Sequence, residues 1–316
     1  MMEKLKIVFM GTPDFAVGIL DTIIKNKYEV VGVVTAADKP AGRGQKVKFS
    51  AVKEYAVANN LKLLQPLNLK DSEFLSELKS LNANLQVVVA FRMLPEVVWN
   101  MPTLGTFNLH ASLLPNYRGA APINWAIING ENKTGVTTFF IDDKIDTGAI
   151  IISKETAILE NENAGELHDK LMNLGSEAVI ETLKLIENKT VRTTVQNNSD
   201  QLKTAYKLNK ENCRIDFLKK GEEIYNLIRG LSPYPTAWFI IKDDDNEWNV
   251  KVYESKFIKD QHALEIGTII TQKKEMKIAI SNGFLEIIVI QMPGKKQMKI
   301  AELLNGMTFS SNAKAL

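Results

Sequence analysis

The segment LQVVVA, Leu85–Ala90, is a continuous apolar run that predicts the central strand of a sheet buried on both faces. Outward from it, Leu5–Met10 and Tyr28–Thr35 are β-rich apolar runs, and Asp14–Lys25 between them has helical spacing. A strand, a helix and a second strand in this order form a βαβ unit, whose strands are parallel. The first half of the chain therefore predicts an α/β fold with a mostly parallel sheet, Rossmann-like in its layers.

Further strands and a long helix are expected to complete this domain. Strands are predicted at Thr106–His110 and Thr137–Ile141, and another begins at Ala149–Ser153. The helix runs from about Ala164 to Asn188, and Asn163 and Glu166 are placed as a capping box at its start. The first domain should end with this helix.

Beyond the helix the pattern changes to short strands separated by turns. Residues 191–206 are polar enough to be a linker between a first domain, 1–190, and a second domain, 207–316. The second domain begins with a helical segment at Lys220–Gly230 and continues with short apolar stretches. These stretches are 237–241, 249–253, 267–271, 276–280 and 284–291. Such a series predicts a smaller C-terminal β-barrel of the OB-like type.

Composition limits the class of protein. The 316-residue chain is 45% hydrophobic and has a formal net charge of +2, which is ordinary for a globular protein. Its apolar runs are too short for a membrane span, and Gly11, Thr12 and Pro13 cut off the first run well short of a signal-peptide core. A cytoplasmic location is expected. The single cysteine, Cys213, excludes an internal disulfide and a multi-cysteine zinc site.

The motifs of several cofactor classes are missing. Gly11 opens a loop after the first predicted strand, but GTPDF does not match G-x-G-x-x-G, and no Walker lysine pattern occurs. The three histidines, His110, His168 and His262, do not lie at H-x-x-x-H spacing. We therefore expect neither a dinucleotide cofactor nor a metal ion.

Asn108 and His110 form the most informative polar pair. They lie two apart in a predicted strand, so their side chains project on the same side. An amide and an imidazole on one face can hydrogen-bond a carbonyl oxygen that becomes negative in a tetrahedral intermediate. Asp146, in a turn between two predicted strands, could set the imidazole tautomer and help remove a proton, with Asp142 and Asp143 as alternatives.

From the residues alone, a buried hydrogen-bond network competes with a catalytic site as the role of this trio. If the trio is catalytic, a covalent acyl-enzyme is disfavoured, because Ser112 lacks a nucleophile elbow and Cys213 lies in the other predicted domain. Direct acyl transfer is then the remaining chemistry.

Five motifs carry a resemblance that decides between these alternatives and spans nearly the whole chain. They are GTPDFA at Gly11–Ala16, DKPAGRGQK at Asp38–Lys46, NLHASLLPNYRGAAPI at Asn108–Ile123, DTGAII at Asp146–Ile151 and LLNGMTF at Leu303–Phe309. On these motifs the chain resembles the folate-dependent formyltransferases, and within them the branch that formylates methionyl initiator tRNA.

The resemblance implies that Asn108, His110 and Asp146 are the catalytic residues and that 10-formyltetrahydrofolate is the formyl donor. The residues it places around the folate are Ser112, Leu113, Leu114, Pro115, Arg92, Met93 and Asp142. Many relatives have Tyr-Gly where this chain has Phe91-Arg92, a difference that backbone contacts would survive.

The resemblance also implies a tRNA-binding surface. Arg43 matches the contact to the acceptor end of the initiator tRNA, with Lys46 and Lys48 beside it. Glycines at 42 and 44 let the backbone approach the nucleic acid, an arginine can bind a phosphate or base edge with two hydrogen bonds, and lysines add phosphate attraction. The barrel is expected to grip the tRNA stem, and the enzyme is expected to be a monomer with no membrane partner.

The implied reaction transfers a formyl group from 10-formyltetrahydrofolate to the α-amino group of methionyl initiator tRNA, for initiation of protein synthesis. The amine attacks the formyl carbon directly, through a tetrahedral intermediate. The alternative is a folate-dependent formyltransferase acting on a sugar nucleotide or another small amine, because such an enzyme would need the same catalytic trio without the Arg43 loop.

Overall fold

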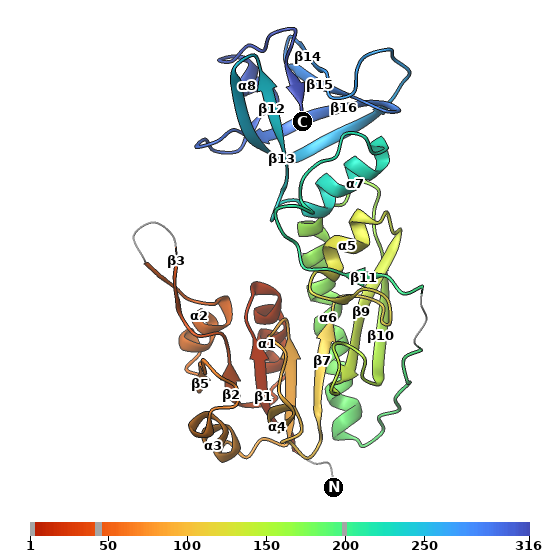
Figure 1. Ribbon diagram of the computed structural model, residues 1–316. Helices are drawn as coiled ribbons and strands as arrows, with labels where there is room; N and C mark the ends of the chain where they lie inside the picture. The colour runs from red at the N-terminus through yellow and green to blue at the C-terminus, as the bar shows by residue number, and fades with distance from the viewer. Residues whose placement is uncertain (1–3, 42–45, 198–200) are drawn as a thin grey trace. The chain divides into compact units, whose positions relative to one another are not determined.

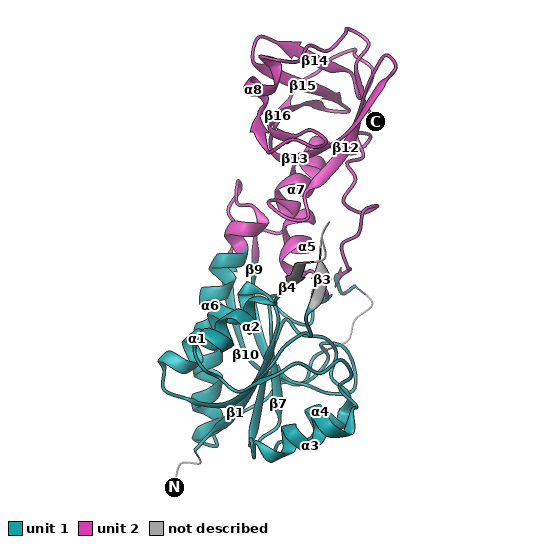
Figure 2. Ribbon diagram, turned by 90° about the vertical axis from the view of Figure 1, so that its left-hand side faces the viewer, with its two compact units in different colours: residues 1–119, 134–156, 168–204 teal, residues 120–133, 157–167, 205–316 magenta. Residues whose placement is uncertain are grey.

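The computed structural model describes residues 4–41, 46–197 and 201–316 (Figure 1). The chain forms two compact units, each built from three segments (Figure 2). Unit 1 consists of Met1–Gly119, Thr134–Thr156 and His168–Thr204, and unit 2 of Ala120–Lys133, Ala157–Leu167 and Ala205–Leu316. The contiguous boundaries expected at 1–190, 191–206 and 207–316 stay a prediction.

Unit 1 is organised around a seven-stranded sheet with the order β10-β9-β7-β6-β1-β2-β5. Its strands are β1 Lys6–Gly11, β2 Glu29–Val34, β5 Leu63–Leu64, β6 Leu85–Val89, β7 Thr106–His110, β9 Lys133–Phe140 and β10 Ile150–Ala157. The pairs β1·β2, β1·β6, β2·β5 and β6·β7 are parallel, and β7·β9 is antiparallel. All five residues of β6, the central strand, are buried. The predicted mostly parallel sheet is confirmed.

Helices cover both faces of this sheet, with α1 and α6 on one side and α3 and α4 on the other (Figure 2). The helices of unit 1 are α1 Asp14–Lys25, α2 Ala51–Ala58, α3 Ser72–Ser80, α4 Glu96–Trp99 and most of α6 Ala164–Glu187. The predicted capping box at the start of α6 is present, because the Asn163 side chain accepts from Glu166 N at 3.0 Å and the Glu166 side chain accepts from Asn163 N at 2.9 Å. Gly175 lets α6 approach β7, since a Cβ there would lie 2.8 Å from Leu109 Cδ2.

Short elements flank the sheet. Strands β3 Lys39–Ala41 and β4 Lys46–Lys48 pair in antiparallel register as a hairpin, and β8 Arg118–Gly119 pairs with β11 Thr204–Ala205. In unit 2, helix α5, Pro122–Ile128, begins with proline in its first turn, where the missing N–H costs no hydrogen bond.

Unit 2 contains the C-terminal barrel, whose strands follow the order β14-β15-β16-β13-β12-β18, with β17 paired to β16. Its elements are α7 Gly221–Leu231, β12 Ala237–Asp243, β13 Asn246–Lys259, β14 Ile269–Gln272, β15 Glu275–Ile280, β16 Gly283–Gln291, β17 Met298–Lys299, α8 Ile300–Leu304 and β18 Lys314–Ala315. The two ends of the order meet, because Thr268 bridges Lys314 and Ile269 N donates to Ala313 O at 3.1 Å. The sheet is therefore nearly closed around a core that includes Phe239 and Ile287, as the OB-like prediction requires.

Candidate active site

Strand β7 places Asn108 and His110 on the sheet face opposite to α6. Leu109 between them packs toward Gly175 of α6, so its two neighbours project to the other side. His110 is 6% exposed, whereas Asn108 is only partly buried. Among the residues that the structure describes, the Asn108 amide makes no hydrogen bond, which leaves its donors available to a ligand.

The turn between β9 and β10 brings Asp146 to this pair. Its Oδ2 lies 3.7 Å from His110 Nδ1, and Gly119 N donates to the same oxygen at 2.9 Å. Asp142, one of the two alternatives, uses its Oδ1 within the turn, where it accepts from Thr147 Oγ1 at 2.7 Å and from Lys144 N at 3.1 Å. Within the described chain, Asp146 is thus the aspartate that faces His110.

The other nitrogen of His110 fixes the orientation of the ring. Nε2 lies 2.8 Å from the carbonyl oxygen of Tyr117. Because a carbonyl only accepts, Nε2 carries the donated hydrogen and Nδ1 is the nitrogen turned toward Asp146. A hydrogen on Nδ1 as well would make the ring an imidazolium, whose positive charge would face the carboxylate.

The segment from Ser112 to Pro115 is held rigidly beside the trio. Thr137 Oγ1 donates to Ser112 O at 2.7 Å and accepts from Leu114 N at 3.2 Å. Ser112 is fully buried and its Oγ donates to Asn116 O at 2.7 Å, so it is not presented as a nucleophile. Leu113 and Pro115 are half-buried. Sequence reasoning missed Thr137, although it lies directly opposite His110 in the β7·β9 register.

The loop after β6 holds the other residues expected near the folate. Arg92 donates from Nη1 to Leu67 O at 2.8 Å and from Nη2 to Pro66 O at 2.5 Å, so its guanidinium ties two loops of unit 1 together. Met93 beside it is 64% exposed. The loop therefore exposes the apolar side chain of Met93, whereas the guanidinium of Arg92 is already hydrogen-bonded to protein atoms.

The hairpin expected to contact tRNA is described only in part. Arg43 lies outside the described residues, while Lys46 and Lys48 belong to β4. At the start of the hairpin, Asp38 forms an ion pair with Lys53 and accepts from Gln65 Nε2 at 2.9 Å. The Lys53 hydrogen bond, and then that of Gln65, hold the pKa of Asp38 below its ordinary value.

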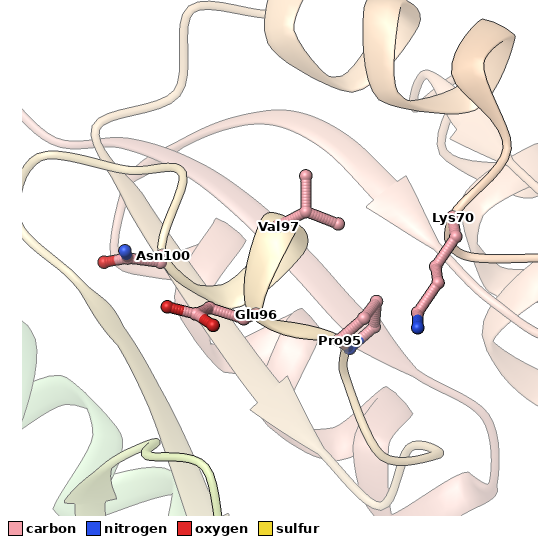
Figure 3. Close-up of a pocket in the computed structure, with 5 residues that line it drawn as sticks. All are labelled: Lys70, Pro95, Glu96, Val97 and Asn100. Atoms are coloured by element: carbon pink, nitrogen blue, oxygen red, sulfur yellow. The ribbon is translucent and has the colours of Figure 1, made fainter.

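Two of the cavities among the described residues, both lined by residues other than the trio, are large enough to consider. One, of about 1070 Å³ within unit 2, is lined by more carboxylates than cations. Its charged residues are Glu131, Glu160, Glu166, Glu222, Glu254, Arg229 and Lys256. The other, about 660 Å³ in unit 1, is lined by five residues whose side chains point in different directions: Lys70, Pro95, Glu96, Val97 and Asn100 (Figure 3).

The described residues contain no group of three or more His, Cys, Asp or Glu side chains arranged to hold a metal ion. In the same part of the chain, no helix combines the length and the apolar character that crossing a membrane requires.

Family models match both halves of the chain. The model described as formyl transferase matches residues 5–183, and the model described as formyl transferase, C-terminal domain, matches residues 207–308.

Curated relatives match over nearly the full length of both sequences. A methionyl-tRNA formyltransferase of Flavobacterium johnsoniae is 72% identical, with 99% of each sequence covered. Proteins of the same name from Flavobacterium psychrophilum and Bacteroides thetaiotaomicron are 66% and 51% identical, with 99% of this chain covered in both cases and 99% and 98% of the relatives.

Solved structures share the fold at lower identity. An N-formyltransferase from Helicobacter canadensis, in complex with folinic acid and dTDP-3-aminofucose, has a TM-score of 0.63 at 23% identity and covers 93% of this chain and 100% of its own. HypX from Aquifex aeolicus, in complex with tetrahydrofolic acid, has a TM-score of 0.64 at 15% identity, with 96% of this chain and 47% of that chain covered. With both halves matched and full-length relatives at 51–72% identity, the chain belongs to the formyl transferase family, in its methionyl-tRNA formyltransferase branch.

Proposed function

We propose that this enzyme transfers a formyl group from 10-formyltetrahydrofolate to the α-amino group of methionyl initiator tRNA, by direct attack of the amine through a tetrahedral intermediate. The observation that supports this chemistry best is the approach of Asp146 to His110 at 3.7 Å beside the free amide of Asn108. The product serves the initiation of protein synthesis, so the enzyme would act in the cytoplasm, and we propose that it acts as a monomer.

In the proposed reaction each member of the trio has one task. The Asn108 amide and His110 stabilise the negative charge that develops on the formyl oxygen. Asp146 orients His110 through Oδ2 and takes up the proton that the attacking amine loses, directly or through a water. As the tetrahedral intermediate collapses, the bond between the formyl carbon and N10 of the folate breaks, and tetrahydrofolate leaves with that proton on N10. Among the described residues Oδ1 of Asp146 has no hydrogen bond and is free for that proton.

The residues around the trio fit a folate. When bound, this group supplies an activated one-carbon acyl unit. The half-buried Leu113 and Pro115 and the exposed Met93 offer apolar surface to a flat pterin ring, and the bonds of Ser112 and Leu114 to Thr137 keep the segment in one conformation. In this proposal Arg92 and Asp142 shape the site through the loops that they hold, since their polar groups already bond protein atoms.

For the tRNA we propose two basic surfaces. Arg43, Lys46 and Lys48 in the β3–β4 hairpin would contact the acceptor end, where an arginine can read a phosphate or base edge. On the barrel, exposed lysines would attract phosphates of the stem, an attraction that weakens as salt rises. These lysines are Lys273, Lys274, Lys295, Lys296 and Lys299.

A comparison of amine acceptors tests the substrate assignment. The purified protein is mixed with 10-formyltetrahydrofolate and with methionyl initiator tRNA, uncharged tRNA or an amino-sugar nucleotide, and formyl product is measured in each. We expect product with methionyl initiator tRNA alone, because only this acceptor combines a free α-amine with the acceptor stem. Product with the amino-sugar nucleotide at an equal or higher rate would overturn the proposal in favour of a sugar formyltransferase.

A further inference from the structure

The proposed proton acceptor occupies an unfavourable backbone conformation. Asp146 has φ of +54°, in the left-handed region that is uncommon outside glycine and that Asp and Asn tolerate better than other residues. A residue keeps such a conformation when its surroundings hold it there. The side chain that binds the Asp146 main-chain carbonyl comes from the segment 191–197, part of the stretch whose polar composition predicts a linker.

Gln196 supplies these contacts. Its side chain is 6% exposed, and Nε2 donates to Asp146 O at 2.9 Å and to Gly148 O at 2.8 Å. Both amide hydrogens are thus used on two carbonyls of one turn. Thr194 and Ile150 exchange two backbone hydrogen bonds of 2.8 Å, which fix the segment beside the turn.

Arg118 determines which way the Gln196 amide points. Its Nε and Nη2 donate to Gln196 Oε1 at 3.1 Å and 2.7 Å. Because a guanidinium only donates, the amide oxygen must face Arg118 and the NH2 group must face the turn. The next residue, Gly119, donates its N–H to Asp146 Oδ2. One connected set of groups therefore holds Asp146 at its main-chain carbonyl and at its carboxylate.

We propose that Gln196 is a positioning residue for formyl transfer, whose amide holds Asp146 in the left-handed conformation that directs the carboxylate at His110. It acts through Asp146, so the inference rests on the proton-acceptor role of Asp146 in the proposed function. A displacement of about 1 Å at a reacting group can cost on the order of 10²-fold in rate. Loss of the two hydrogen bonds should therefore affect turnover more than tRNA binding.

The direct test replaces the two donors and little else. Gln196→Glu keeps the length of the side chain and an acceptor for Arg118, but turns an oxygen toward the two carbonyls. We expect kcat to fall roughly 10- to 100-fold, with KM for methionyl initiator tRNA changed less than about 3-fold. Gln196→Met, which removes the donors without adding charge, should lose kcat in the same way.

The matched control is Asn197→Asp, the same amide-to-carboxylate change at the next position, where the side chain is exposed. It should retain the wild-type kcat. Wild-type kcat in both Gln196 variants would overturn the inference.

A double-mutant cycle separates positioning from a merely structural role. Asp146→Asn tolerates the same backbone conformation and removes the proton acceptor. In that background Gln196→Glu should change single-turnover formylation by less than about 2-fold, because the group it positions is gone. A full multiplicative loss would show that Gln196 acts elsewhere. Wild-type turnover of Asp146→Asn itself would instead contradict the proposed function.

Discussion

At the scale of single residues, the trio shows which part of a site can be predicted from sequence. The two-residue period of a strand predicts that Asn108 and His110 lie on the same face, and in the structure both lie on the face opposite to Leu109. The approach of Asp146 depends on a left-handed residue in a turn, a conformation that the sequence does not show, so Asp142 and Asp143 stay alternatives to Asp146 until the structure is known. Gln196 could not be found at all, because it lies 50 residues from Asp146 in a stretch of linker composition.

The one cysteine gives a residue-level prediction about accessibility and pH. Cys213 is 4% exposed in the barrel core, and burial raises the pKa of its thiol above the ordinary value of 9.0. Since the thiolate is the reactive form, labelling by a thiol reagent at pH 8 should be slow in the native protein and fast after denaturation. The stability that depends on the neutral thiol is fully present below about pH 9 and is lost as pH rises through the higher native pKa. Labelling of native protein at the rate of a free thiol would contradict this burial.

At the scale of elements, the turn between β9 and β10 depends on Gly148. A Cβ at this position would lie 1.6 Å from Phe140 O and 2.8 Å from Phe140 C, distances that no side chain can accept. Because residue 148 has no side chain, the chain can pass this close to Phe140 and continue from the turn that holds Asp146 into β10. The sequence alone identifies Gly148 as a glycine in a turn, but it does not show how close Phe140 lies to it.

Gly148→Ala should therefore destabilise the protein by about 2 kcal/mol or more, the usual scale for forcing atoms into a packed site. It should also lower turnover, because the backbone that carries Asp146 must move. Gly306→Ala is the control, since a Cβ there would meet no atom within 4 Å, and its effect should stay within about 0.5 kcal/mol. Denaturant unfolding measures both. Equal midpoints for the two variants would refute the packing argument.

At the scale of the whole molecule, the sequence predicted both architectures but not their details. Hydrophobic periodicity located β1, β2, β6, β7, α1 and α6 as well as the main strands of the barrel, because each of them buries a face that repeats along the chain. It could not show that residues 120–133 and 157–167 pack with the C-terminal segment, because that grouping depends on contacts between distant residues. The sequence also could not predict that β18 closes the barrel, because a strand of two residues is too short to show a hydrophobic period.

Single-turnover formylation of methionyl initiator tRNA by Asn108→Ala and His110→Ala tests the central claim most directly, with tRNA affinity measured in parallel. Asn249→Ala, an exposed asparagine of β13 in unit 2, is the control and should behave as wild type. The trio predicts a rate loss of about 10²-fold or more in each active-site variant, the scale for removing an oxyanion donor, with tRNA affinity unchanged. A wild-type rate in either variant would contradict the assignment of Asn108, His110 and Asp146 as the groups that carry formyl transfer.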